Sequence, residues 1–267
     1  MRSGGWRFDH VTPLVLPLPE PDGPLELRIR NVATGLGYVL EGWTLRGAHG
    51  DTVPADAYLP ADQEARAVVV VLHGRRGSRK VPYVRGAAKR WSRDGLAVVA
   101  IDAPYHGERA LDQIPDLARN EPFLAQTVGD LRRLCTAIGA DGRLANLPVG
   151  YVGFSMGVLV GVPFMAVDRR VWCGVFAVGG ATGTGATDPA TYAPLIRERP
   201  VLLVNADGDE FFDQASVTTL YQAFGGSQEL LQFPGTHGDW RHPARRYRAM
   251  FDFLRAHLAG DGRGGRG

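Results

Sequence analysis

The segment YVGFSMGVLVG (151–161) places Ser155 between Gly153 and Gly157, behind strand-forming residues and ahead of an apolar run. This G-x-S-x-G pattern is typical of a nucleophilic serine held on a tight strand-to-helix turn. The two glycines are needed because such a turn packs backbone against backbone and leaves no room for a Cβ atom. Ser155 is therefore the candidate nucleophile, and the alternative is an ordinary polar residue in a buried turn.

A serine hydroxyl becomes a good nucleophile only when a base takes its proton and an acid orients that base. Three histidines follow Ser155 along the chain: His237, His242 and His257. The last two belong to a final amphipathic stretch, where solvated histidines are common. His237 instead lies in FPGTHGDW, a glycine-flanked loop before that stretch. We predict His237 as the base.

The acid is expected in VLLVNADGDEFF, where carboxylates follow an apolar strand. Asp209 lies at the tip of the predicted loop and is the favoured acid. Asp207 ends the strand and can simply form an Asp-Gly turn. It stays open as the alternative acid.

Backbone N–H donors must also stabilise the oxyanion that forms during acyl transfer. One predicted donor is the N–H of Met156, directly after the nucleophile. The second is the N–H of Arg75 in LHGRRGSRK, after the first long apolar strand. His73 in the same turn is expected to make a structural hydrogen bond, with a role as base as the alternative.

The elements that must position these residues alternate between strand and helix. Nearly continuous apolar runs predict strands covered on both faces, at 65–74, 96–104, 147–155, 171–180 and 199–208. Helix-length segments lie at 81–94, 118–139, 156–167 and 213–224, with a last amphipathic stretch after them. Short β-rich runs from about 25 to 60 predict an antiparallel meander. The pattern predicts an α/β fold with a mostly parallel sheet of about eight strands and helices on both faces. Ligands then belong at the carboxyl ends of the strands.

Composition indicates a soluble protein, because 45% of the 267 residues are hydrophobic, 22% are charged, and no apolar run approaches membrane-spanning length. We expect one domain over 1–260 and a disordered Arg/Gly tail at 261–267. The start of the chain lacks a secretory pattern, so we expect a cytoplasmic protein. A net charge of +2 disfavours nucleic acid or a membrane as partner. Cys135 and Cys173 are expected to be buried and to pack like small hydrophobic residues. Neither a metal nor a cofactor is expected.

With these motifs, the chain resembles the α/β-hydrolase superfamily from about residue 25 to about residue 259. DAPYHGER (102–109), HGRRG and GFSMG resemble the dienelactone-hydrolase-like and prolyl-oligopeptidase-like esterases. The resemblance implies hydrolysis of carboxylic esters through an acyl-enzyme, with Ser155, Asp209 and His237 as the triad. Ala206 stands where that family usually has glycine, which keeps Asp207 open as the acid. Serine stands where dienelactone hydrolases commonly have cysteine, which disfavours a dienelactone substrate.

Within DAPYHGER, Asp102 and His106 are expected to brace the turn after the second parallel strand, with a catalytic role as the lesser alternative.

The segment 181–200 is too short for a large lid, so the site is expected to be open with a minimal cap or none. Aromatic side chains that flank the catalytic segments are the candidate substrate-binding residues: Tyr105, Phe211, Phe212 and Trp240. A basic loop containing Arg75, Arg76, Arg79 and Lys80 could favour esters that carry a carboxylate, with a solvated basic loop as the alternative.

The predicted function is a serine carboxylesterase acting on small to medium acyl esters, with a small-molecule ester as its partner. A peptidase or thioesterase could use the same triad. A non-catalytic binding protein on the same scaffold, or an RNA binder acting through the Arg/Gly tail, is the remaining alternative. The oligomeric state is left open by the sequence.

Overall fold

The computed structural model describes residues 16–19, 21–111, 120–183, 185–239 and 243–258, so the tail expected at 261–267 lies outside the described residues. The described residues form one nine-stranded sheet, where about eight strands were expected, in the order β1-β2-β3-β5-β4-β6-β7-β8-β9. The strands are β1 (Arg28–Gly35), β2 (Tyr38–Arg46), β3 (Thr52–Pro60), β4 (Ala67–Leu72), β5 (Leu96–Ile101), β6 (Val149–Phe154), β7 (Val171–Ala177), β8 (Val201–Ala206) and β9 (Gln228–Phe233).

Both parts of the sheet follow the predicted pattern. β1, β2 and β3 pair antiparallel and form the expected meander, and β3 joins β5, also antiparallel. From β5 through β4 to β9 every pairing is parallel. β4, β5, β6 and β8 are buried along their whole length, because helices cover both faces of the sheet.

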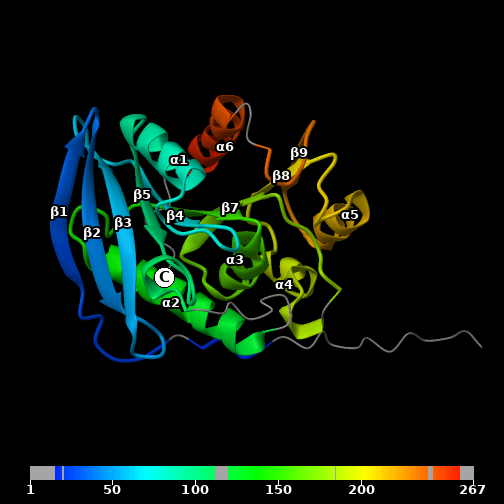
Figure 1. Ribbon diagram of the computed structural model, residues 1–267, viewed down its shortest axis with the longest axis horizontal. Coiled ribbons are helices and arrows are strands. Elements are labelled where there is room, and N and C mark those ends of the chain that lie inside the picture. The colour runs from blue at the N-terminus through cyan, green and yellow to red at the C-terminus, as the bar shows by residue number, and fades with distance from the viewer. Residues whose placement is uncertain (1–15, 20, 112–119, 184, 240–242, 259–267) are drawn as a thin grey trace, which may run out of the picture.

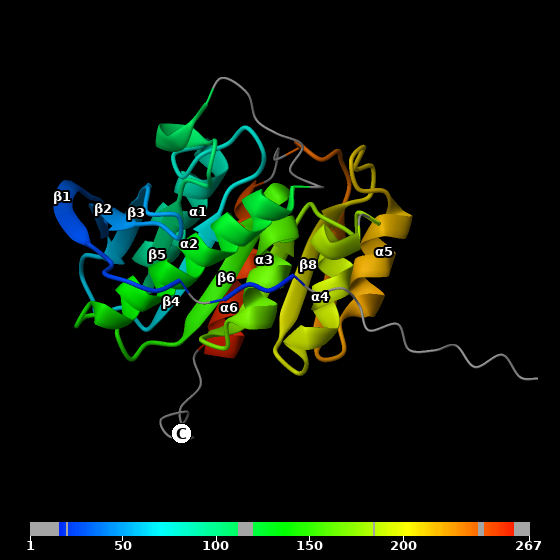
Figure 2. The ribbon, with the colours of Figure 1, turned by 90° about the horizontal axis from the view of Figure 1, so that it is seen from below.

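The helices pack on the two faces as separate layers (Figures 1 and 2). The α-helices are α1 (Pro82–Arg93), α2 (Glu121–Ala140), α3 (Met156–Val167), α4 (Pro189–Ile196), α5 (Gln214–Ala223) and α6 (Pro243–Leu258), with short 3₁₀ turns η1 (Gly107–Arg109) and η3 (Gly185–Thr187). One core holds α1 and α6 against the sheet, and the other holds α2, α3, α4 and α5. None of the helices in the described ranges is both long and apolar enough to cross a bilayer.

α4 was not predicted. It lies in 181–200, the segment expected to hold a minimal cap or none. The prolines in its sequence obscure the helical pattern. Asp188 caps its first turn by accepting a hydrogen bond from the N–H of Ala190, and Tyr192 is fully buried. α4 packs on α3 and therefore belongs to the helical layer.

The strand order changes direction at β4, because the next strand in sequence, β5, lies on one side of β4 and β6 lies on the other. The helix after β4, α1, lies on one face, whereas the helix after β6, α3, lies on the other. Neighbouring strands whose connections leave on opposite faces open a crevice at their carboxyl ends. The turns after β4 and β6 therefore meet at this crevice.

A buried ion cluster fixes the loop that follows β4. The guanidinium of Arg79 is only 4% exposed and contacts Asp102, Asp56 and Glu108. Asp102, which follows β5, also accepts hydrogen bonds from the backbone N–H groups of Arg79 at 2.7 Å and Glu108 at 2.9 Å. Asp102 thus braces the turns after β4 and β5 against each other, as expected.

Replacing Asp102 with alanine should leave the Arg79 guanidinium buried beside fewer carboxylates. We expect the free energy of unfolding to fall by about 3–5 kcal/mol, measured by urea denaturation. Glu26→Ala is the matched control, because it removes a carboxylate from a half-exposed pair with Arg46 and should cost less than about 1 kcal/mol. Equal losses in the two variants would contradict the bracing role.

Candidate functional site

Ser155 occupies the tight turn between β6 and α3. Its backbone has φ 52° and ψ −108°, a conformation that a residue with a side chain rarely adopts. A Cβ at Gly153 would run into the backbone carbonyl of Gly157, and one at Gly157 would lie 2.5 Å from the carbonyl oxygen of Leu72. Both flanking glycines are therefore required by close backbone packing, as the motif predicts.

The buried side of this turn is held by Tyr151. Its hydroxyl donates a 2.7 Å hydrogen bond to the carbonyl oxygen of Gly157, at the start of α3. Complete burial raises the pKa of Tyr151 well above its usual value, so the hydroxyl stays protonated and remains a donor. The backbone N–H of Ser155 donates to the carbonyl of Ala177 at 2.8 Å, which ties the turn to β7.

Three side chains predicted from distant segments meet above this turn. His237 Nε2 lies 2.9 Å from Ser155 Oγ, and His237 Nδ1 lies 2.8 Å from Asp209 Oδ2. A carboxylate only accepts hydrogen bonds, so Nδ1 carries the hydrogen and Nε2 is left to accept the hydroxyl proton of Ser155. A hydrogen-bond chain of this kind is able to activate a serine hydroxyl.

Asp209 and Asp207 have different contacts. The side chain of Asp209 is fully buried, and its Oδ1 accepts hydrogen bonds from the N–H groups of Phe211 and Phe212, both at 2.9 Å. Asp207 does not contact the imidazole; its Oδ1 accepts a 3.1 Å hydrogen bond from the N–H of Gly235. The geometry therefore favours Asp209 as the partner of His237.

The other two histidines near this edge are buried and make structural contacts. His73 Nδ1 lies 2.8 Å from the carbonyl oxygen of Gly74, and its Nε2 accepts a 3.2 Å hydrogen bond from Ala103 N–H. Burial lowers the pKa of His73 to about 4. His106 donates from Nδ1 to the carbonyl of Pro104 at 2.7 Å, and burial also lowers its pKa. Neither ring makes a hydrogen bond to Ser155 in the described structure.

The two residues predicted as oxyanion donors belong to turns that contact each other at Ser155. Met156 is the first residue of α3, and the first N–H groups of a helix have no partner within the helix. Arg75 follows Gly74, where an added Cβ would lie 3.3 Å from the Cβ of Ser155. The turn after β4 is thus in direct contact with the turn that carries the serine.

Backbone strain is concentrated at this edge of the sheet. Six described residues other than glycine have positive φ, and four of them follow the carboxyl ends of β4 to β7: Arg76 (61°), Tyr105 (65°), Ser155 (52°) and Val178 (50°). Each such residue costs about 1–3 kcal/mol and persists only where its surroundings hold it, which is common at functional sites.

The predicted substrate-binding residues differ in their positions. Phe211 is 71% exposed, and its ring meets the His237 ring edge-on with centroids 4.9 Å apart. The Phe212 ring lies 5.9 Å from that of His237, whereas Tyr105 stacks on Phe123 at 6.2 Å. Trp240 lies outside the described residues.

A small apolar hollow lies beside Met156, between α2 and α3. Its volume is about 10 Å³, and its lining residues come from α2, α3 and η3: Phe123, Leu124, Met156, Leu159, Val160 and Thr187. Apart from Met156, these residues have the sequence pattern of ordinary core positions, and the packing of α2 against α3 places them here.

The basic loop is divided between buried and exposed side chains. Arg79 belongs to the buried ion cluster, and Lys80 pairs with Glu108 at 2.6 Å. The Arg79 charge is therefore compensated inside the fold, whereas the Lys80–Glu108 pair lies at the surface, with both side chains more than half exposed. The side chains of Arg75 and Arg76 are exposed beside the crevice.

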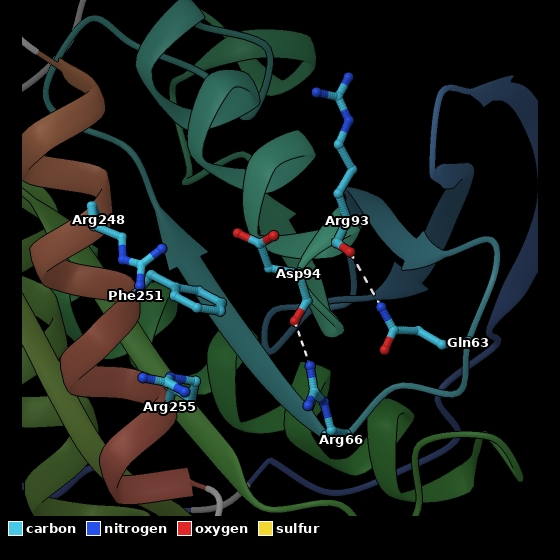
Figure 3. A pocket seen from close by; sticks show the side chains of 7 residues that line it. All are labelled: Gln63, Arg66, Arg93, Asp94, Arg248, Phe251 and Arg255. Atoms are coloured by element: carbon cyan, nitrogen blue, oxygen red, sulfur yellow. Dashed lines mark hydrogen bonds between the residues drawn. The ribbon is translucent and has the colours of Figure 1, made fainter.

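A larger cavity of about 380 Å³ lies at the opposite, amino end of the strands (Figure 3). Its polar groups have structural partners: Gln63 and Arg66 donate to the last carbonyls of the α1 segment, those of Arg93 and Asp94. Arg248 pairs with Asp252 along α6. These contacts explain the cavity lining as helix capping and surface pairing.

The described residues contain no group of three or more His, Cys, Asp or Glu side chains arranged to hold a metal ion. Cys135 and Cys173 are both buried and unbridged, as expected. Burial raises the pKa of the Cys173 thiol to about 12.

Several solved structures resemble this chain. An esterase from an Arctic intertidal metagenomic library is 26% identical, with a TM-score of 0.72 over 85% of this chain and 97% of that one. Acetyl xylan esterase 1 from Thermoanaerobacterium sp. JW/SL YS485 is 12% identical, with a TM-score of 0.72 over 91% and 96%. The acylaminoacyl peptidase of Pyrococcus horikoshii is 14% identical, with a TM-score of 0.72 over 86% of this chain but 43% of its own. No curated protein matches the chain.

The model of one family, described as serine aminopeptidase S33, matches residues 63–199, about half of the chain. The matched range includes the turn after β4, Arg79 and Asp102 of the ion cluster, and Ser155, and it ends before β8. Together with the fold, this match identifies the chain as a hydrolase that belongs to the serine aminopeptidase S33 family of the α/β-hydrolase superfamily.

Proposed function

We propose that this hydrolase is a serine carboxylesterase that cleaves small to medium acyl esters through an acyl-enzyme. The observation that carries the proposal is the continuous hydrogen-bond chain from Asp209 through His237 to Ser155. Ser155 Oγ attacks the ester carbonyl carbon while His237 Nε2 takes its proton. The imidazolium then protonates the leaving alcohol, and water releases the acyl group by the same two steps.

The negative oxygen of each tetrahedral intermediate needs fixed donors. We assign this role to the backbone N–H groups of Met156, directly after Ser155, and of Arg75, in the turn that contacts Ser155. One such donor contributes about 3–4 kcal/mol of transition-state stabilisation. The left-handed backbone at Ser155 supports the assignment, because it exposes the hydroxyl at the start of α3.

The share of each similar structure that aligns with this chain favours esters over peptides as the substrates. Two esterases align over 97% and 96% of their own length, whereas 43% of the acylaminoacyl peptidase aligns. The family description favours an aminopeptidase as the second candidate, and that activity would use the same triad. A thioesterase would use it too, whereas a binding protein would have no need of the assembled hydrogen-bond chain.

Ser155→Ala should abolish both labelling by a fluorophosphonate probe and hydrolysis of p-nitrophenyl acetate. We expect kcat to fall by about 10⁴-fold or more, because the attacking oxygen is removed. Graded p-nitrophenyl esters should give their highest kcat/KM with short to medium acyl chains. Absence of labelling in the unmodified protein would reject the proposal, and faster cleavage of aminoacyl amides than of esters would favour the aminopeptidase.

Asp209→Asn should reduce kcat by about 10⁴-fold, because an amide no longer fixes the tautomer of His237. Asp207→Asn is the matched control, since it keeps an acceptor oxygen for the N–H of Gly235. We expect it to retain activity within about threefold. Steady-state kinetics of both variants decides between the two carboxylates, and a larger loss in Asp207→Asn would reverse the assignment.

The exposed side chains of Arg75 and Arg76 support a preference for esters that carry a carboxylate. At low ionic strength, kcat/KM for a hemisuccinate ester should exceed that for a neutral ester of equal length, and salt should reduce the difference. Arg75→Gln with Arg76→Gln should remove the preference and keep the backbone donor. This role would be contradicted if the kcat/KM preference for the hemisuccinate ester changed neither with salt nor in the Arg75→Gln, Arg76→Gln variant.

A further inference from the structure

Three of the carboxylates in the loop after β8 contact the histidine loop, each at a different part of it. Asp207 Oδ1 accepts the N–H of Gly235 at 3.1 Å, and Asp209 Oδ2 lies 2.8 Å from the imidazole Nδ1. Glu210 Oε2 accepts the backbone N–H of His237 at 3.0 Å. The DGDE sequence therefore binds both the ring and the main chain of His237.

The histidine loop needs such contacts because it leaves the edge of the sheet. β9 pairs with β8, and the backbone pairing continues beyond the strands through Asp207 N–H to Phe233 O at 3.0 Å and Gly208 N–H to Gly235 O at 2.9 Å. Past Gly235, which has φ 136°, this ladder stops. The contact from Glu210 is then the one that reaches the main chain of His237 itself.

We propose that Glu210 is a positioning residue that holds the main chain of His237 so that Nε2 stays within hydrogen-bonding distance of Ser155 Oγ. This inference rests on the proposed function of the Ser155, His237 and Asp209 triad. Asp209 alone fixes the ring at Nδ1 and leaves the loop free to pivot about that contact. A second contact, on the backbone N–H of the same residue, removes the pivot.

Glu210 affects His237 in two ways: its hydrogen bond positions the main chain, and its carboxylate places a negative charge near the imidazole. Among the described residues, the other charged groups around the histidine loop are Asp209, which contacts the ring, Asp207 and Asp239, which lie against Gly235, and Arg246, which donates to the carbonyl of Asp239. Glutamine at position 210 keeps an acceptor oxygen and removes the charge, whereas alanine removes both. The pair of variants therefore separates the hydrogen bond from the charge.

The test compares Glu210→Ala, Glu210→Gln and Asp213→Asn by kcat and KM for a p-nitrophenyl ester. Loss of the hydrogen bond should lower kcat about tenfold in Glu210→Ala with KM unchanged, while Glu210→Gln stays within about threefold of the unmodified protein. Asp213 lies in the same loop and caps α5, so Asp213→Asn removes a nearby charge without touching the histidine loop and should keep full activity. Thermal midpoints of all three should match that of the unmodified protein, because both side chains are exposed.

Each outcome separates this inference from the proposed function. An unmodified protein that neither reacts with the phosphonate nor cleaves esters would reject the function itself. An active protein in which Glu210→Ala keeps its kcat would overturn only the role of Glu210. Equal losses in the alanine and glutamine variants would also overturn it, because the charge and not the hydrogen bond would then be responsible.

Discussion

The close backbone contact between the β6–α3 turn and the end of β4 is the constraint on which the site depends. Gly157 lies so near the carbonyl of Leu72 that any side chain there would collide with it, and Gly153 is equally confined by Gly157. This packing holds Ser155 in the left-handed region, where its hydroxyl stands clear of the strand. The same contact brings the turn after β4 beside the serine.

The sheet converts this local constraint into a site by placing the ends of its strands in a row. β4 and β6 are neighbours although many residues separate them, because α1 and α2 cross to opposite faces. β8 and β9 then bring the acid and histidine loops to the same edge. The four strained residues at this edge are held by fully buried strands and by the cluster around Arg79.

The carboxylates around the site have separate roles that their positions explain. Asp102 is buried and joins two turns, whereas Asp209 is buried and faces an imidazole. Asp207 and Glu210 are exposed and accept hydrogen bonds from the backbone of the histidine loop. Burial and the partner, and not the residue type, distinguish a brace from a catalytic candidate.

The sequence by itself determined the alternation of strands and helices, the turn at Ser155 and the two loops that carry His237 and Asp209, because apolar periodicity and glycine spacing are local signals. It did not reveal α4, whose prolines obscure the helical pattern, or the hollow formed where α2 packs beside Met156. It left Asp207 and Asp209 open, since both follow β8 within three residues and only the path of the loop decides which one faces the imidazole. Tertiary structure also decided that Arg79 is paired inside the fold and Lys80 is paired with Glu108 at the surface, while Arg75 and Arg76 are exposed. The physical reason is the same in each case: these outcomes depend on contacts between segments far apart in the chain, and no local pattern encodes them.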